Sequence, residues 1–296
     1  MYPQDLVVSG SGGLCIISDS QVNLRDPYAT TGMAFYQDTF YRCIQKQEYL
    51  ELVTYRTEGV SSEYFIRIKD IHDLAPFQGK LYAVSTGSNE IYEINKDLEY
   101  SDVIKFPGEG DAWHLNCLTV VEGKLYCSAF CDDPRHYNYK GRTKDNGFVI
   151  DVFSGDILMD GLSQPHSPLF HDGKLFVCNS ECRSLVARDM QSGLIDEVIF
   201  NGYTRGLHIE NDIAYVGLSK SRGSSDPNES ARIVLYDLRK RSVLTEWRIP
   251  FDEVYEIKAL DDVVADRLLS HAYKKPRLHM AKAKLGLSRY FKIGFK

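Results

Sequence analysis

The sequence has no apolar run approaching the roughly 18 residues that a membrane-spanning helix needs. Its first residues, MYPQDLVVSGSGG, also lack the basic segment and following apolar run that mark a secretory signal. Seven cysteines are an odd number in a chain of 296 residues, which is long enough to fold without disulfides. These absences predict a cytoplasmic protein with reduced thiols.

The low proline content and the lack of helical periodicity narrow the fold class further. Only 10 residues are proline, and no stretch before residue 271 repeats its apolar residues at the 3.6-residue spacing of a helix. Tyrosine and phenylalanine are abundant instead, with 19 and 14 residues, and aromatic side chains favour strands. The composition therefore favours an all-β domain.

Acidic residues are absent from one end of the chain. Residues 271–296 hold eight Lys and Arg but no Asp or Glu, and subtracting these charges from the formal total of −6 leaves about −14 on the rest. An acidic body argues against nucleic acid as the main partner. We therefore divide the chain into a domain over residues 1–270 and a basic tail over residues 271–296.

One hairpin-like segment recurs along the domain, with two short alternating runs joined by a two-residue turn. The copies run from Thr30 to Tyr41, Ile71 to Tyr82, Leu115 to Tyr126, Pro165 to Phe176, Thr204 to Tyr215 and about Val254 to Ala265. Asn, Asp and Gly tolerate the positive φ angles of tight hairpin turns. Such residues occur at all six turns, which are Gln37-Asp38, Gln78-Gly79, Glu122-Gly123, Asp172-Gly173, Asn211-Asp212 and Asp261-Asp262.

The middle hairpins are followed by a third and a fourth alternating run. Four antiparallel strands repeated every 40–50 residues or so are typical of propeller blades. The sixth unit has only two strands before the basic tail, so we expect the N-terminal runs Asp5–Ser9 and Leu14–Ser18 to supply the other two. The sequence thus predicts a six-bladed β-propeller whose last blade is closed by N-terminal strands.

One face of the predicted propeller carries its long loops, over residues 106–113, 131–147, 219–231 and 250–254. Loops on a rigid scaffold are where binding residues usually lie. Aligning the six copies on their turns places one position at the start of each inner strand on this face, occupied by Thr31, His72, Asn116, His166, Arg205 and Tyr255. We call these residues the first row.

The next position in each copy forms a second row of Gly32, Asp73, Cys117, Ser167, Gly206 and Glu256. Because side chains alternate along a strand, only one row is expected to face the channel. Any single polar residue of the first row is equally consistent with a contact between blades. The set as a whole is costly to bury unless its members are satisfied together, so we predict a functional site at this channel mouth.

Two groups of segments resemble motifs of an uncharacterised bacterial propeller family. They are Pro165-His166-Ser167-Pro168 with His171-Asp172-Gly173, and Gly202-Tyr203-Thr204-Arg205-Gly206-Leu207 with Val216-Gly217-Leu218-Ser219-Lys220. The resemblance spans the chain from about Thr31 to Glu256. It implies an association with glycan-building enzymes and therefore a carbohydrate ligand.

The repeated pattern of histidine, apolar residue, turn and glycine is also similar, at the level of single blades, to virginiamycin B lyase and the gluconolactonase-type propellers. This resemblance implies a divalent metal ion at the channel mouth that acidifies a carbon atom or activates water. The full set of metal-binding carboxylates of those proteins is not present in this sequence.

Our first functional hypothesis is an enzyme, a lyase, epimerase or hydrolase that acts on a sugar-like or polyhydroxylated small molecule. His72 and His166 would either bind a divalent metal ion with Glu256 as third ligand, or serve as general acid and base. Arg205 would hold a carboxylate or phosphate group, or stabilise an enolate-like charge. The expected substrate-binding residues are Asn116, His114, Tyr255, Thr31 and Trp113.

The second hypothesis is a non-catalytic binding or scaffold module, peripheral to a membrane or to glycan-assembly enzymes. Residues 274–296 mix cations with apolar residues, as does an amphipathic helix that lies on an anionic membrane. The same residues are equally suited to packing across the acidic body of the propeller.

Overall fold

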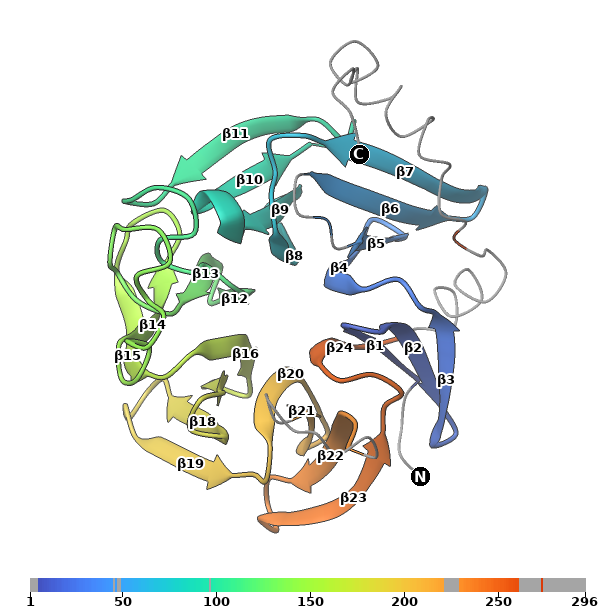
Figure 1. Cartoon of the computed structure of the whole chain (residues 1–296). Coiled ribbons are helices and arrows are strands. Elements are labelled where there is room, and N and C mark those ends of the chain that lie inside the picture. Colours follow the sequence, from blue (N-terminus) through green and yellow to red (C-terminus); the bar gives the residue numbers. More distant parts are fainter. Residues whose placement is uncertain are drawn as a thin grey trace, which may run out of the picture.

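The computed structural model describes residues 5–44, 46, 49–95, 97–220, 229–260 and 273. In this part of the chain, 24 strands form six four-stranded antiparallel sheets, arranged as blades around a central channel (Figure 1). The only helix among the described residues is a single 3₁₀ turn. The predicted all-β, six-bladed β-propeller is confirmed.

Each blade is numbered from its inner strand outward, starting with the first complete blade after the N-terminus. Blade 1 comprises β4 (Thr30–Tyr36), β5 (Thr39–Ile44), β6 (Leu50–Arg56) and β7 (Gly59–Phe65). Blade 2 comprises β8 (Ile71–Phe77), β9 (Lys80–Ser85), the 3₁₀ helix η1 (Thr86–Ser88), β10 (Glu90–Ile94) and β11 (Tyr100–Lys105). Blade 3 comprises β12 (Leu118–Val121), β13 (Lys124–Ala129), β14 (Gly147–Asp151) and β15 (Ile157–Leu162).

The second half of the ring repeats this order. Blade 4 comprises β16 (Pro165–His171), β17 (Lys174–Asn179), β18 (Ser184–Asp189) and β19 (Ile195–Ile199). Blade 5 comprises β20 (Tyr203–Glu210), β21 (Ile213–Ser219), β22 (Arg232–Asp237) and β23 (Ser242–Arg248). Blade 6 comprises β24 (Val254–Ala259), β1 (Leu6–Gly10), β2 (Gly13–Ser18) and β3 (Gln21–Asp26).

The predicted hairpin turns join the first two strands of blades 1 to 5. Both residues of each turn have positive φ angles, between +46° and +80°. This geometry matches the twist of the strands on either side, which explains why Asn, Asp and Gly recur there. The sixth predicted turn, Asp261-Asp262, lies outside the described residues.

Closure of the ring differs from the prediction in one respect. The N-terminal segment supplies three strands of blade 6 rather than two, because β1 pairs directly with the inner strand β24, with Val8 opposite Ile257. A tight turn at Asp19-Ser20, with φ angles of +49° and +63°, then leads into β3 as the outer strand. The N-terminal segment therefore supplies every strand of blade 6 except the inner strand β24.

Apolar side chains pack between neighbouring blades rather than in one central core. Val84 and Ile91 of blade 2, for example, share a buried cluster with Leu125 and Ile150 of blade 3. Full burial of each such side chain contributes about 1.5–3 kcal/mol. Because equivalent clusters join the other neighbouring blades, the channel wall is rigid enough to hold polar side chains in fixed positions.

The inner strands bulge where the first and second rows meet. Strand pairing skips between Thr30 and Met33, between Ile71 and Asp73, between His166 and Leu169, and between Thr204 and Leu207. A bulge places an extra residue in one strand and so breaks the strict alternation of side chains. The expectation that only one row faces the channel is therefore wrong, since members of both rows line cavities in it.

The second row joins each inner strand to the next blade. The side chains of Asp73, Ser167 and Glu256 accept hydrogen bonds from the backbone N–H groups of Leu118, Gly206 and Met33 respectively. Gly32 occupies the same row, and a Cβ atom there would lie 2.8 Å from the backbone of Asp73. These residues therefore hold the inner strands together, below the mouth where the first row lies.

Candidate functional site at the channel mouth

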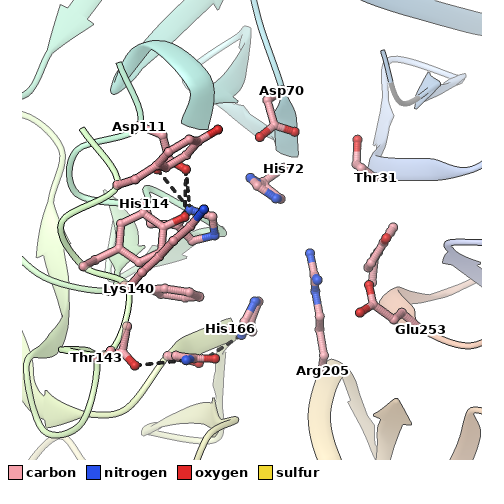
Figure 2. A pocket seen from close by; sticks show the side chains of 16 residues that line it. Thr31, Asp70, His72, Asp111, His114, Lys140, Thr143, His166, Arg205 and Glu253 are labelled. Atoms are coloured by element: carbon pink, nitrogen blue, oxygen red, sulfur yellow. Dashed lines mark hydrogen bonds and ion pairs between the residues drawn. The ribbon is translucent and has the colours of Figure 1, made fainter. Parts of the chain in front are cut away.

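A cavity of about 520 Å³ opens at the face that carries the long loops. The starts of the inner strands, the loop before blade 3 and the long loop between β13 and β14 within blade 3 form its walls (Figure 2). Its lining residues are Thr31, Asp70, His72, Asp111, His114, Phe130, Tyr137, Tyr139, Lys140, Gly141, Thr143, Gln164, His166, Arg205, Glu253 and Tyr255. We call this cavity the mouth pocket.

Five of the six first-row residues line the mouth pocket, and the exception is Asn116. Asn116 is fully buried, and its Oδ1 atom accepts a hydrogen bond from the Cys117 thiol at 3.2 Å. Strand β12 begins only at Leu118, so the chain enters blade 3 by a different path. His114 takes the place at the mouth that the alignment had given to Asn116.

Trp113 was expected to stack on a substrate, but it does not line the mouth pocket. Its indole is 9% exposed and packs between blades 2 and 3, edge-on to Phe148 with the ring centroids 5.6 Å apart. The aromatic rings that do line the pocket are those of Phe130, Tyr137, Tyr139 and Tyr255.

The hydrogen bonds of His166 define which of its ring nitrogens carries the proton. Its Nδ1 atom lies 2.9 Å from the carbonyl oxygen of Gln164, which can only accept. Nδ1 is therefore protonated, and the unprotonated Nε2 atom remains for the pocket. Burial, together with the nearby charge of Arg205, lowers the pKa of His166 well below its usual value, so the ring stays neutral near pH 7.

His72 has the same arrangement on the neighbouring wall. Its Nδ1 atom contacts the hydroxyl of Thr86, and that hydroxyl donates its own proton to the carbonyl oxygen of Leu115 at 2.5 Å. The Thr86 oxygen must therefore accept from Nδ1, which again leaves Nε2 unprotonated. Burial, with the charges of His114 and Arg205, also holds the pKa of His72 well below its usual value.

His114 differs from these two because its Nδ1 atom contacts a carboxylate. Both oxygens of Asp111 lie 3.0 Å from it, and Asp111 also accepts a hydrogen bond of 2.9 Å from the Tyr139 hydroxyl. Asp111 is 3% exposed, so its carboxylate is shielded from water, whereas the side chain of His114 is 16% exposed. A buried carboxylate on Nδ1 orients the ring and stabilises the imidazolium that forms when Nε2 takes up a proton.

Arg205 places a cation beside these imidazole rings. It is 7% exposed, its Nε atom is buried without a partner, and no hydrogen bond or ion pair joins its guanidinium to another described residue. The guanidinium carbon lies 4.1 Å from the centroid of the Tyr255 ring. Figure 2 shows the group extending from β20 into the space that His72 and His166 border. Such a group is suited to binding an anion.

The pocket also has residues that the sequence analysis did not single out, chiefly Asp70, Asp111, Tyr139, Lys140 and Gln164. Asp111 lies in the loop before blade 3, and Tyr139 and Lys140 lie in the loop between β13 and β14. These two loops pack on each other, since the N–H of Tyr137 donates to the Asp111 carbonyl at 2.8 Å. Loop length was the only signal for them in the sequence.

The proposed metal ligands are not brought together. Glu256 faces a second cavity of about 340 Å³ farther along the channel, with Asp73 and Lys258, whereas His72 and His166 line the mouth pocket. The bulges separate the two rows in this way. Among the described residues, no group of three His, Cys, Asp or Glu side chains is arranged to hold a metal ion. The residues present therefore do not fit the expected metal site.

Sequence comparison identifies the family. Residues 49–268 match the family described as Domain of unknown function (DUF4915). The chain belongs to this family. A search of curated proteins returns no match. The DUF4915 match includes every first-row residue except Thr31, and all the loops that form the mouth pocket.

Solved structures share the fold of this DUF4915 chain at low sequence identity. A chain in a crystal structure of a nidogen/laminin complex has a TM-score of 0.66 at 12% identity, covering 86% of this chain and 97% of the other. A protein of unknown function from Bacteroides caccae has a TM-score of 0.60 at 15% identity, with 86% and 98% covered. Virginiamycin B lyase from Staphylococcus aureus has a TM-score of 0.54 at 11% identity, with 84% and 85% covered. At these identities the likeness shows the fold alone.

The membrane hypothesis depends on residues 274–296, which lie outside the described residues. The part of the chain that the structure describes contains no helix with the length and hydropathy that crossing a bilayer requires. Tyr273 is described and lies buried beside blade 1, where its hydroxyl donates to Glu51 at 2.6 Å.

Proposed function

We propose that this chain is an enzyme that binds a small, anionic, polyhydroxylated molecule in the mouth pocket and catalyses proton-transfer chemistry on it, as a lyase or an epimerase does. The observation that carries the proposal is the guanidinium of Arg205, which has no hydrogen bond or ion pair with another described residue, beside three imidazoles whose Nδ1 atoms are all engaged by the protein. A binding module has no need of three rings held in one tautomer.

The substrate class follows from the chemistry of the walls. Arg205 supplies the donors for an anionic group, while the Nε2 atoms of His72 and His166 accept hydrogen bonds from hydroxyl groups. Thr31 adds a buried hydroxyl that has no hydrogen-bond partner among the described residues. A volume of about 520 Å³ lies in the range of small-molecule sites and suits a sugar-sized ligand.

Binding measurements test the proposal. We expect calorimetry to detect binding of anionic sugars, taken from a panel of uronates, aldonates and hexose phosphates, and much weaker binding of glucose. Arg205→Gln should weaken binding of the anions by about 10- to 100-fold, because a hydrogen bond to a charged group contributes about 1.5–3 kcal/mol.

Arg239→Gln is the matched control, since Arg239 is exposed and paired with Asp212 at 2.6 Å, far from the pocket-lining residues. It should leave binding unchanged. If no anionic sugar binds, or if Arg205→Gln binds the anions as tightly as the unaltered protein, the proposed function is wrong.

A further inference from the structure

The three histidines of the mouth pocket are not chemically equivalent. His72 and His166 donate from Nδ1 to uncharged oxygens, those of the Thr86 hydroxyl and the Gln164 carbonyl. His114 alone donates to a carboxylate, that of Asp111. A proton taken up at Nε2 creates a positive ring, and only His114 has a buried negative charge in contact with that ring. His114 is therefore the one histidine of the three whose positively charged form a carboxylate in contact with the ring would stabilise.

The charges around Arg205 restrict the anion that it can hold. Three carboxyl side chains, those of Asp70, Asp111 and Glu253, line the same pocket, and the second cation of the lining, Lys140, is exposed and lies 3.8 Å from the centroid of the Tyr137 ring. A phosphate ester would bring nearly two negative charges to one buried guanidinium among these carboxyl groups. A carboxylate brings one charge and matches the planar guanidinium edge with two parallel hydrogen bonds.

We infer that the substrate is a hydroxy acid of sugar size whose carboxylate binds Arg205, and that His114 is the base that removes the proton from the carbon next to this carboxylate. This inference rests on the proposed function. It assigns to His114 a catalytic role and to His72 and His166 the role of accepting hydrogen bonds from the substrate's hydroxyl groups.

The step balances without a further reactant. The Nε2 atom of His114 takes the proton, and the electron pair of the broken C–H bond moves into the carboxylate, where Arg205 stabilises the added charge. Return of the proton to the opposite face inverts the carbon. Alternatively, a C–O bond on the next carbon breaks as a C=C bond forms, and the departing oxygen takes the proton from the His114 imidazolium.

Deuterium exchange tests the inference on the full chain. The probes are glucuronate, galacturonate and gluconate, with glucose 6-phosphate and glucose for comparison, each incubated with protein in deuterated buffer. We expect the carboxylates to bind more tightly than the phosphate, and proton NMR to show loss of the signal of the carbon next to the carboxylate of at least one bound probe. His114→Gln should slow this exchange about 100-fold or more while binding stays within a few-fold.

His171→Gln is the matched control, because His171 lies at the far end of β16 outside the mouth pocket, and it should exchange normally. Tighter binding of glucose 6-phosphate would overturn the inference but leave the proposed function standing. The inference would also be overturned if the carboxylate probes bind without exchanging the proton next to the carboxylate, or if His114→Gln exchanges it as fast as the unaltered protein. Absence of binding by every anionic probe would instead remove the proposed function itself.

Discussion

Two buried arginines of this protein have opposite surroundings. Arg42 is fully buried and forms a two-pronged ion pair with Asp26, at 2.6 and 2.9 Å. Arg205 is almost as buried, but no hydrogen bond or ion pair joins it to another described residue, and its guanidinium lies over the Tyr255 ring. Burying a charge without a partner costs free energy, so a fold selected for stability alone would not keep Arg205. The site is therefore maintained at the expense of stability.

This contrast gives a prediction for stability at Arg205. Replacing the side chain by methionine of similar length removes an unpaired charge and keeps the packing on Tyr255. We expect Arg205→Met to raise the free energy of unfolding by about 1–2 kcal/mol, since the lost cation–π contact offsets part of the relieved desolvation. Urea denaturation measures the change, and a variant less stable than the unaltered protein would show that Arg205 has a stabilising partner.

Within the inner strands, the bulges allow the two rows of side chains to have different structural roles. Five of the six first-row residues line the mouth pocket, and Asp73, Ser167 and Glu256 of the second row accept hydrogen bonds from N–H groups of the next blade. Within the second row, Asp73 and Glu256 share a hydrogen bond beside Lys258, whose Nζ atom lies 3.1 Å from Glu256. Burial and the neighbouring Asp73 raise the pKa of Glu256 well above its usual value, so one proton is held by the pair.

The protonated state of Glu256 predicts how substitutions there behave. Glutamine preserves an acceptor for the Met33 N–H, although its amide nitrogen then faces Lys258, so Glu256→Gln should destabilise the protein less than Glu256→Ala does at pH 5. Glu256→Ala leaves the N–H of Met33 unsatisfied and should cost about 1–3 kcal/mol.

The pH dependence of the free energy of unfolding distinguishes a protonated from an ionised Glu256. Above the ordinary glutamate pKa the unfolded chain has lost a proton that folded Glu256 keeps, so this residue lowers the stability of the native protein as pH rises. Glutamine has no such proton. Urea denaturation at pH 5 and pH 8 should therefore show Glu256→Gln gaining stability relative to the unaltered protein at the higher pH. An equal difference at both values would mean that Glu256 is ionised in the folded state.

For the whole molecule, the number of blades was predictable because it depends on local chemistry. Each hairpin turn needs positive φ angles, and residues such as Asp172-Gly173 that adopt them cheaply recur in register. The share of blade 6 contributed by the N-terminus was not predictable in the same way. Strand β3 is an outer strand whose residues are exposed or half-buried, so it has no clear alternation, and its pairing depends on contacts distant in sequence.

The mouth pocket was predictable to the extent that it follows the repeat. Alignment of the copies found the positions of His72, His166 and Arg205, because each begins an inner strand. The alignment did not reveal Asp111, and it assigned the mouth position of blade 3 to Asn116 instead of His114, because the loop before blade 3 departs from the repeat. Nor does alternation along a strand reveal a bulge, and this is why Glu256 was expected beside the histidines.

Closure of the ring provides the last prediction. Asp26 ends β3, the outermost of the three N-terminal strands, and its partner Arg42 belongs to β5 of blade 1, so this ion pair ties blade 6 to the start of the ring. Arg42→Met leaves Asp26 with a nearly buried, unpaired charge and should lower the free energy of unfolding by about 3–5 kcal/mol. Adding Asp26→Asn removes that charge and keeps an acceptor for the N–H of Tyr28, 3.1 Å away, so the double variant should recover part of the loss. Urea denaturation of both variants measures the difference. A cost below 1 kcal/mol for Arg42→Met would mean that strand pairing and apolar packing close the propeller without a contribution from this ion pair.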